Sequence, residues 1–169
     1  MQMHASTPPS SVVTYLSDHF AGPMFAIAEA ERVLSHVTDE ALATFLGRFV
    51  SELRAERDVL HGVIEALGSS PIALKAMTGW LAEKATLFKL SGFTTLSLFE
   101  SLETLRLGVQ GKRGPWAYLT ELARLDARLQ GFDLAPLVRQ SDEQIDPLEA
   151  FRREAGLALA REEGAIPRG

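Results

Sequence analysis

Glu56 is the residue whose position most clearly needs a chemical explanation. It lies within a series of apolar residues whose spacing alternates between three and four, which places them on one face of a helix. The series comprises Leu42, Phe45, Leu46, Phe49, Leu53, Glu56, Leu60, Val63 and Leu67. Burying an unpaired carboxylate costs several kcal/mol. Glu56 must therefore be paired, hydrogen-bonded, protonated or bound to a metal.

Two long helices are expected in the first part of the chain. The first should run from about residue 11 to residue 36, with a bend at Gly22-Pro23, because proline removes a backbone donor and crowds the preceding turn. Thr38 is a suitable N-cap for the second helix, which carries Glu56 and should end at Gly68.

The second part of the chain predicts three more helices. A shorter amphipathic helix is expected over residues 71–90, and one long kinked helix over residues 94–129. The last helix should cover residues 134–163, kinked or split at Pro147. No segment alternates with period two, so we expect an all-α fold. The order of long and short helices predicts a four-helix bundle with one long helical crossover, in which the second and third long helices run parallel.

The chain of 169 residues is expected to form one domain. Residues 1–11 are polar and contain two prolines, so we expect a disordered N-terminal segment. The bundle domain should cover residues 12–163, followed by a frayed tail over residues 164–169.

Counting residues from the expected turns indicates which side chains meet Glu56. His19 lies at the same depth in the first helix, and Gln110 lies near that depth in the third. A turn near Phe132 would bring Arg152 to the same level from the last helix. We therefore predict an interior polar cluster of His19, Glu56, Gln110 and Arg152. A guanidinium fork satisfies a carboxylate without any ion, so an ion pair with Arg152 or a contact with His19 is favoured for Glu56.

The run Gly111-Lys112-Arg113-Gly114 interrupts the apolar pattern of the third long helix. It lacks the spacing of a phosphate-binding loop and follows no strand, so we interpret it as a helix kink with two solvated cations. Beyond it, Trp116, Tyr118 and Leu119 could leave an apolar patch, and we expect a homodimer.

The composition restricts the classes of function. A net charge of −5 argues against non-specific binding to nucleic acid. The absence of cysteine excludes disulfides, thiolate metal sites and a cysteine nucleophile. No stretch approaches the roughly 18 apolar residues that span a bilayer, and no secretory signal is visible. We therefore expect a cytoplasmic protein without integral membrane association.

The segments TYLSDHFAG, SELRAERDVL and GVQGKRGPW, together with the order of the helices, give the chain a resemblance to the ferritin-like superfamily, especially its small bacterial members. This resemblance implies a glutamate on the first and third helices and a Glu-x-x-His motif on the second. Glu56 matches the second-helix glutamate, but Val59 occupies the position of the histidine. Asp58 and His61 have the right spacing, but they point away from the apolar face.

The departures from the ferritin-like pattern favour a bundle without an intact di-metal site. A di-iron centre needs about four carboxylates and no fixed cation, whereas the predicted cluster has one carboxylate and an arginine. We expect a non-catalytic protein of the stress-associated or scaffold type that acts through its surface or its assembly, with no cofactor.

Two other interpretations stay open. The first is a carboxylate–histidine metal protein, an oxidase or iron-handling enzyme, that binds Fe or Mn through His19, Glu52 and Glu56. The second is a membrane-surface protein that uses the crossover helix with Trp80 and Lys84.

Overall fold

The computed structural model of the chain describes residues 10–68 and 92–167. This part of the chain contains four long α-helices and one short 3₁₀ turn, and it has no strand. The helices are α1 (Ser11–Leu34), α2 (Glu40–Ala66), α4 (Thr95–Leu122) and α5 (Ala135–Glu162), and the 3₁₀ turn η2 covers Ala127–Leu129. The predicted all-α class is confirmed for these residues. The predicted helix over residues 71–90, with Trp80 and Lys84, lies outside them.

Side-chain caps fix where three of the helices begin. The Ser10 side chain accepts a hydrogen bond from the Val13 amide at the start of α1. Thr94 forms a capping box with Ser97 at the start of α4. The predicted Thr38 cap of α2 is wrong by one residue. Asp39 is the N-cap instead, because its carboxylate accepts from an amide in the first turn and a charged acceptor binds the orphan amides more strongly.

Three prolines lie inside continuous helices. Pro23 lies within α1, Pro115 within α4 and Pro147 within α5. The expectation of a single helix through residues 111–115 is therefore confirmed, but this helix ends at Leu122 and not at residue 129, and α5 is not split. Each proline removes one backbone hydrogen bond, so packing against the neighbouring helices must stabilise the helix across these points.

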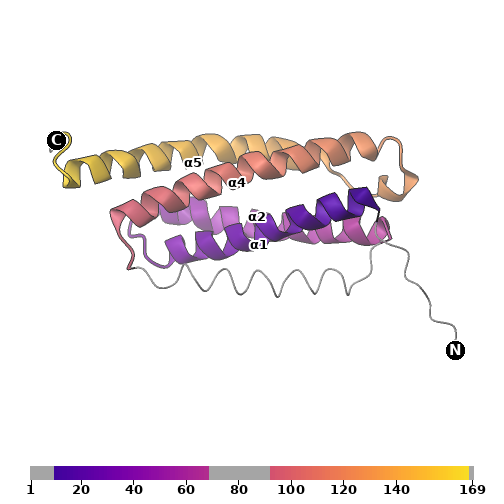
Figure 1. Ribbon diagram of the computed structural model, residues 1–169, viewed down its shortest axis with the longest axis horizontal. Coiled ribbons are helices and arrows are strands. Elements are labelled where there is room, and N and C mark those ends of the chain that lie inside the picture. Colours follow the sequence, from indigo (N-terminus) through magenta and orange to yellow (C-terminus); the bar gives the residue numbers. More distant parts are fainter. Residues whose placement is uncertain (1–9, 69–91, 168–169) are drawn as a thin grey trace, which may run out of the picture.

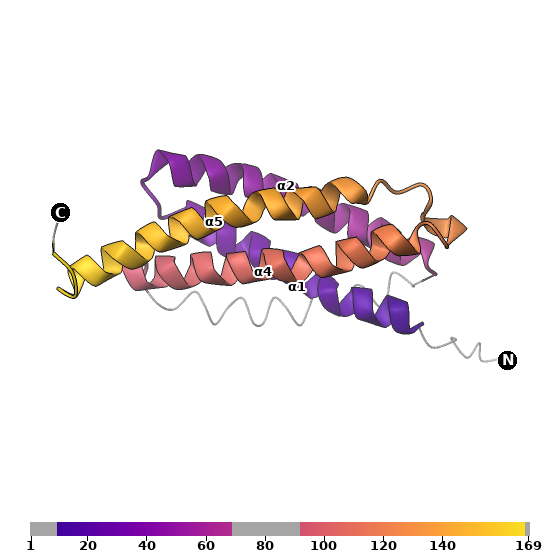
Figure 2. The ribbon, with the colours of Figure 1, turned by 90° about the horizontal axis from the view of Figure 1, so that it is seen from above.

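The four helices lie side by side along a common long axis (Figures 1 and 2). Figure 1 shows that α2 and α4 run in the same direction and that α1 and α5 run in the opposite one. Helix α1 packs against both α2 and α4, α4 packs against α5, and α2 also contacts α5. The parallel second and third long helices that the sequence predicted are confirmed.

The apolar interior consists of two clusters that follow each other along the bundle. One cluster contains Phe45, Phe49, Leu53, Leu102, Leu105, Val109 and Leu148 among its members. The other contains Leu16, Leu60, Val63, Ile64, Trp116, Leu119 and Leu134. The predicted apolar face of α2 is buried from Leu42 to Val63, and it contributes to both clusters. Glu56 lies between the two contributions.

Close packing between α4 and α5 depends on Gly156. A Cβ atom at this position would lie 2.9 Å from a ring carbon of Phe99 on α4. We expect Gly156→Ala to lower the free energy of unfolding by about 1–3 kcal/mol, because the aromatic ring has to move. Equilibrium unfolding in urea measures the change.

Gly47 on α2 provides the matched control. A Cβ there meets nothing within 4 Å, so Gly47→Ala should stabilise the protein by about 0.5–1 kcal/mol through helix propensity alone. Equal stabilities for the two variants would contradict the close approach of α4 and α5.

Candidate functional site

Glu56 is buried at the centre of the bundle and has partners for both carboxylate oxygens. Its exposed fraction is 1%. The Lys112 ammonium donates to Oε1, and the Trp116 indole Nε1–H donates to Oε2 at 3.3 Å. Both donors come from α4, four residues apart and thus on one face of that helix. The predicted ion pair of Glu56 exists, but its cation is a lysine.

Lys112 is the residue that the sequence interpretation misplaced. Its side chain is only 10% exposed, whereas the neighbouring Arg113 is turned outward and pairs with the exposed Asp142. The run was interpreted as a kink with two solvated cations, which is correct for Arg113 and wrong for Lys112. The i, i+4 relation of Lys112 and Trp116, at the depth of Glu56, was the available signal.

Burial shifts both members of the central ion pair toward their neutral forms. Removal from water raises the pKa of Glu56, an effect that the Lys112 charge and the hydrogen bonds from Lys112 and Trp116 only partly offset. The same removal from water lowers the pKa of Lys112, against the attraction of Glu56. The proton between these two groups is therefore held less firmly on nitrogen than in a solvated ion pair.

Arg152 does not reach Glu56, contrary to the prediction. Its guanidinium donates to the Glu149 carboxylate at 2.9 and 2.8 Å and lies over the ring of Phe99. It therefore belongs to a partly exposed network between α4 and α5.

The misplacement of Arg152 has a geometric cause. The depth count assumed a turn near Phe132, but α4 ends at Leu122 and α5 begins at Ala135. The midpoint between the helices thus lies several residues earlier, and each residue of that displacement moves the level partner by two residues, about 3 Å along the axis. Gln144 occupies the central level of α5 in place of Arg152 and is 3% exposed.

Gln110 and His19 are also absent from the central ion pair. Gln110 is exposed and accepts a hydrogen bond from Arg106 at 3.3 Å. The His19 ring nitrogen Nδ1 lies 2.9 Å from the carbonyl oxygen of Tyr15 on its own helix. Of the predicted cluster, Glu56 alone belongs to the central ion pair, and His19 lines a cavity.

Glu52 and Gln144 lie beside the central ion pair and form with it a polar layer that reaches α5. The Oε2 atom of Glu52 accepts from Gln144 Nε2 at 2.6 Å, and its Oε1 lies 3.5 Å from Arg48 Nε. His19, Glu52 and Glu56 were the candidate metal ligands, and they do not form a ligand group. Within residues 10–68 and 92–167, no three His, Asp or Glu side chains gather closely enough to hold a metal ion.

A cavity of about 240 Å³ lies against the central ion pair, between α1, α2 and α4. Its walls are mainly apolar, and Lys112 and Trp116 form the part of the wall that adjoins the central ion pair. The buried walls are formed by Phe49, Leu53, Leu60, Leu105 and Val109. Exposed Asp18, Gly22, Gly108 and Gly111 also line it, so this side faces solvent among the described residues. A Cβ atom at any of these three glycines would meet nothing within 4 Å.

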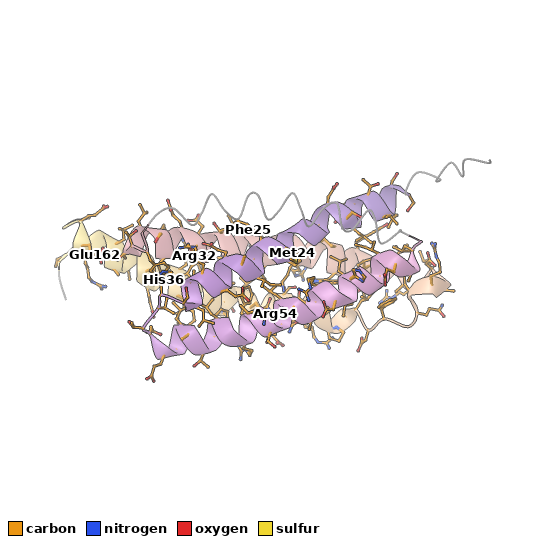
Figure 3. All side chains as sticks on the ribbon, turned by 90° about the horizontal axis from the view of Figure 1, so that it is seen from below. Met24, Phe25, Arg32, His36, Arg54 and Glu162 are labelled. Atoms are coloured by element: carbon orange, nitrogen blue, oxygen red, sulfur yellow. The ribbon has the colours of Figure 1, made fainter. Side chains whose placement is uncertain are left out.

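A second buried polar cluster joins α1 to α4 and was not predicted. The Glu29 carboxylate accepts two hydrogen bonds from Arg32, at 3.0 and 2.7 Å. Arg32 also donates to the Ser101 hydroxyl at 2.7 Å. Arg32 lies toward the end of the bundle that carries His36 and Glu162 (Figure 3). The i, i+3 spacing of Glu29 and Arg32 was the only signal in the sequence.

The apolar patch proposed for dimerisation is mostly interior. Trp116 and Leu119 are buried in the second apolar cluster, and only Tyr118 is exposed, where its ring meets the edge of Tyr15. The homodimer remains a prediction. Among the helices of the described ranges, none has the length and apolar character needed to cross a membrane.

Comparison of the chain with protein-family models, with curated proteins and with solved structures finds no match.

Removal of the Glu56 carboxylate should leave the Lys112 ammonium buried without its ion-pair partner. We expect Glu56→Ala to lower the free energy of unfolding by about 3–5 kcal/mol, and Glu56→Gln to cost less because it keeps a hydrogen-bond acceptor. Glu31, which forms an exposed ion pair with Arg54, is the control, and Glu31→Ala should cost no more than about 1 kcal/mol. Similar losses for the alanine variants in urea unfolding would contradict the account.

The lowered pKa of Glu29 predicts that the stability of the protein depends on pH. Burial alone would raise its pKa, but the hydrogen bonds from Arg32 and Ser101 and the Arg32 charge outweigh burial, so the pKa lies below its ordinary 4.5. The unfolded state then binds the proton first on acidification. The stabilisation by Glu29 is complete above pH 4.5 and is lost as the pH falls through the folded pKa.

The comparison of wild type with Glu29→Gln tests this sign. The difference in their free energies of unfolding should be largest near neutral pH and should shrink below pH 4.5. Glu154→Gln, at an exposed position on α5, is the control and should show a smaller change. A wild-type advantage that stays constant throughout the acid range would rule out the linkage.

Proposed function

We propose that this chain is a ferritin-like helical bundle that works as a binding protein for a small apolar molecule. The observation that carries the proposal is the cavity of about 240 Å³, whose mainly apolar wall includes Lys112 and Trp116, the two donors to the buried Glu56 carboxylate. Apolar cavities with a few convergent polar groups are the usual form of ligand sites.

The central ion pair supports a non-catalytic bundle without a di-metal centre. Lys112 supplies the positive charge that a ferritin-like carboxylate would otherwise receive from a metal, and a fixed ammonium repels a divalent cation. An iron- or manganese-dependent oxidase would need Lys112 to leave Glu56, and it would need further ligands beyond His19 and Glu52. The ion pair therefore favours binding over metal chemistry.

The size and lining of the cavity limit the ligand. An apolar cavity of about 150 Å³ is large enough to bind benzene, so the present one would hold a single substituted ring. The buried walls provide dispersion contacts and little hydrogen bonding, which favours a mainly hydrocarbon ligand. One hydrogen-bond acceptor on that ring could be directed toward Lys112.

Titration with toluene tests the proposal. Trp116 lines the site and its indole N–H donates to Glu56, so the indole resonance in ¹H–¹⁵N spectra should shift saturably as toluene binds. Trp80→Phe leaves Trp116 as the sole tryptophan and assigns the signal.

Ala26→Leu should weaken toluene binding by at least about tenfold, because Ala26 lines the cavity and the larger side chain fills it. Ala41→Leu makes the same change at an exposed position on α2 and should leave binding intact. The absence of any Trp116 shift, or binding to Ala26→Leu as tight as to wild type, would refute the binding function.

A further inference from the structure

Lys112 presents donors that the described protein atoms do not use. An ammonium has three N–H groups, and among residues 10–68 and 92–167 Glu56 is the one acceptor that contacts it. The side chain is also part of the cavity wall. A molecule in the cavity therefore lies beside Lys112, whose nitrogen has donors that Glu56 leaves unused.

The surroundings of Lys112 favour an uncharged acceptor over an anion. Its charge is already balanced by Glu56, and Glu52 adds a second nearby negative charge that acts on both. Asp18 lies on the same cavity wall. An incoming carboxylate would meet these three negative groups and only one buried ammonium, whereas a carbonyl oxygen would meet no net repulsion.

We propose that Lys112 captures small aromatic aldehydes as an imine, with Glu56 moving the proton. This inference rests on the proposed binding function, because the aldehyde must first occupy the cavity. A lysine that is desolvated in an apolar pocket is the usual form of an imine-forming nucleophile. The directions in which burial shifts the two groups, toward free amine and carboxylic acid, agree with this role.

The reaction balances without any external reagent. Glu56 takes a proton from the Lys112 ammonium, the free amine forms a C–N bond to the aldehyde carbon, and one amine proton moves to the aldehyde oxygen to give a carbinolamine. Glu56 then returns the proton to the carbinolamine hydroxyl, and the C–O bond breaks to release water. The product is a protonated imine whose positive charge remains paired with the Glu56 carboxylate.

The chain offers few competing amines. Its four lysines are Lys75, Lys84, Lys89 and Lys112, and Lys112 is the one within the described residues. Peptide mapping can therefore assign an adduct to Lys112 without ambiguity.

Reductive trapping tests the inference on the full chain. Wild-type protein is treated with benzaldehyde and cyanoborohydride, and benzyl adducts are quantified at each lysine by peptide mass spectrometry. We expect the Lys112 adduct to form on the order of tenfold faster than adducts at the other three lysines. Saturating toluene should slow trapping at Lys112 and leave the others unchanged.

A triple variant, Lys75→Arg with Lys84→Arg and Lys89→Arg, provides the control and should retain trapping at Lys112. Slow or absent labelling of Lys112 would overturn the inference, as would labelling that toluene does not affect. Toluene shifts of Trp116 measured on the same preparation separate the two claims. If those shifts persist while Lys112 stays unlabelled, the imine chemistry fails and the binding function stands.

Discussion

A carboxylate in the middle of an apolar bundle is the constraint on which the rest of this structure depends. Glu56 cannot remain charged in that position without a cation and a second donor, and α4 supplies both from one turn. The pair and its neighbours Glu52 and Gln144 form a polar layer that separates the two apolar clusters. Because breaking a buried pair is costly, this layer fixes α2 and α4 in one register.

The cavity follows from the same layer. Lys112 and Trp116, which donate to Glu56, are directed across the bundle toward α2. On the side of the layer that faces α1, the cavity is lined by the small residues Gly22, Gly108 and Gly111. Small residues remove packing volume there, while Pro23 limits how α1 can adjust. A polar layer and an adjacent apolar space thus arise together, and the proposed ligand would reach the buried lysine through this space.

The helices and the burial of Glu56 could be predicted from the sequence because apolar periodicity is a local signal. The partner of Glu56 depends on the register between helices, which the loops determine. The α1–α2 connection is short, and His19 lines the cavity beside the central ion pair. Residues between α4 and α5 include a 3₁₀ turn, and the resulting shift brings Gln144, and not the predicted Arg152, to the central level of α5. Lys112 was excluded because glycines beside it suggested a solvated kink.

A high-resolution electron-density map around the Glu56 carboxylate tests the central claim most directly. The account predicts the Lys112 nitrogen within hydrogen-bonding distance of one carboxylate oxygen and the Trp116 indole nitrogen beside the other. A strong spherical peak about 2 Å from that carboxylate, with an anomalous signal for iron or manganese and with Lys112 turned away, would contradict it.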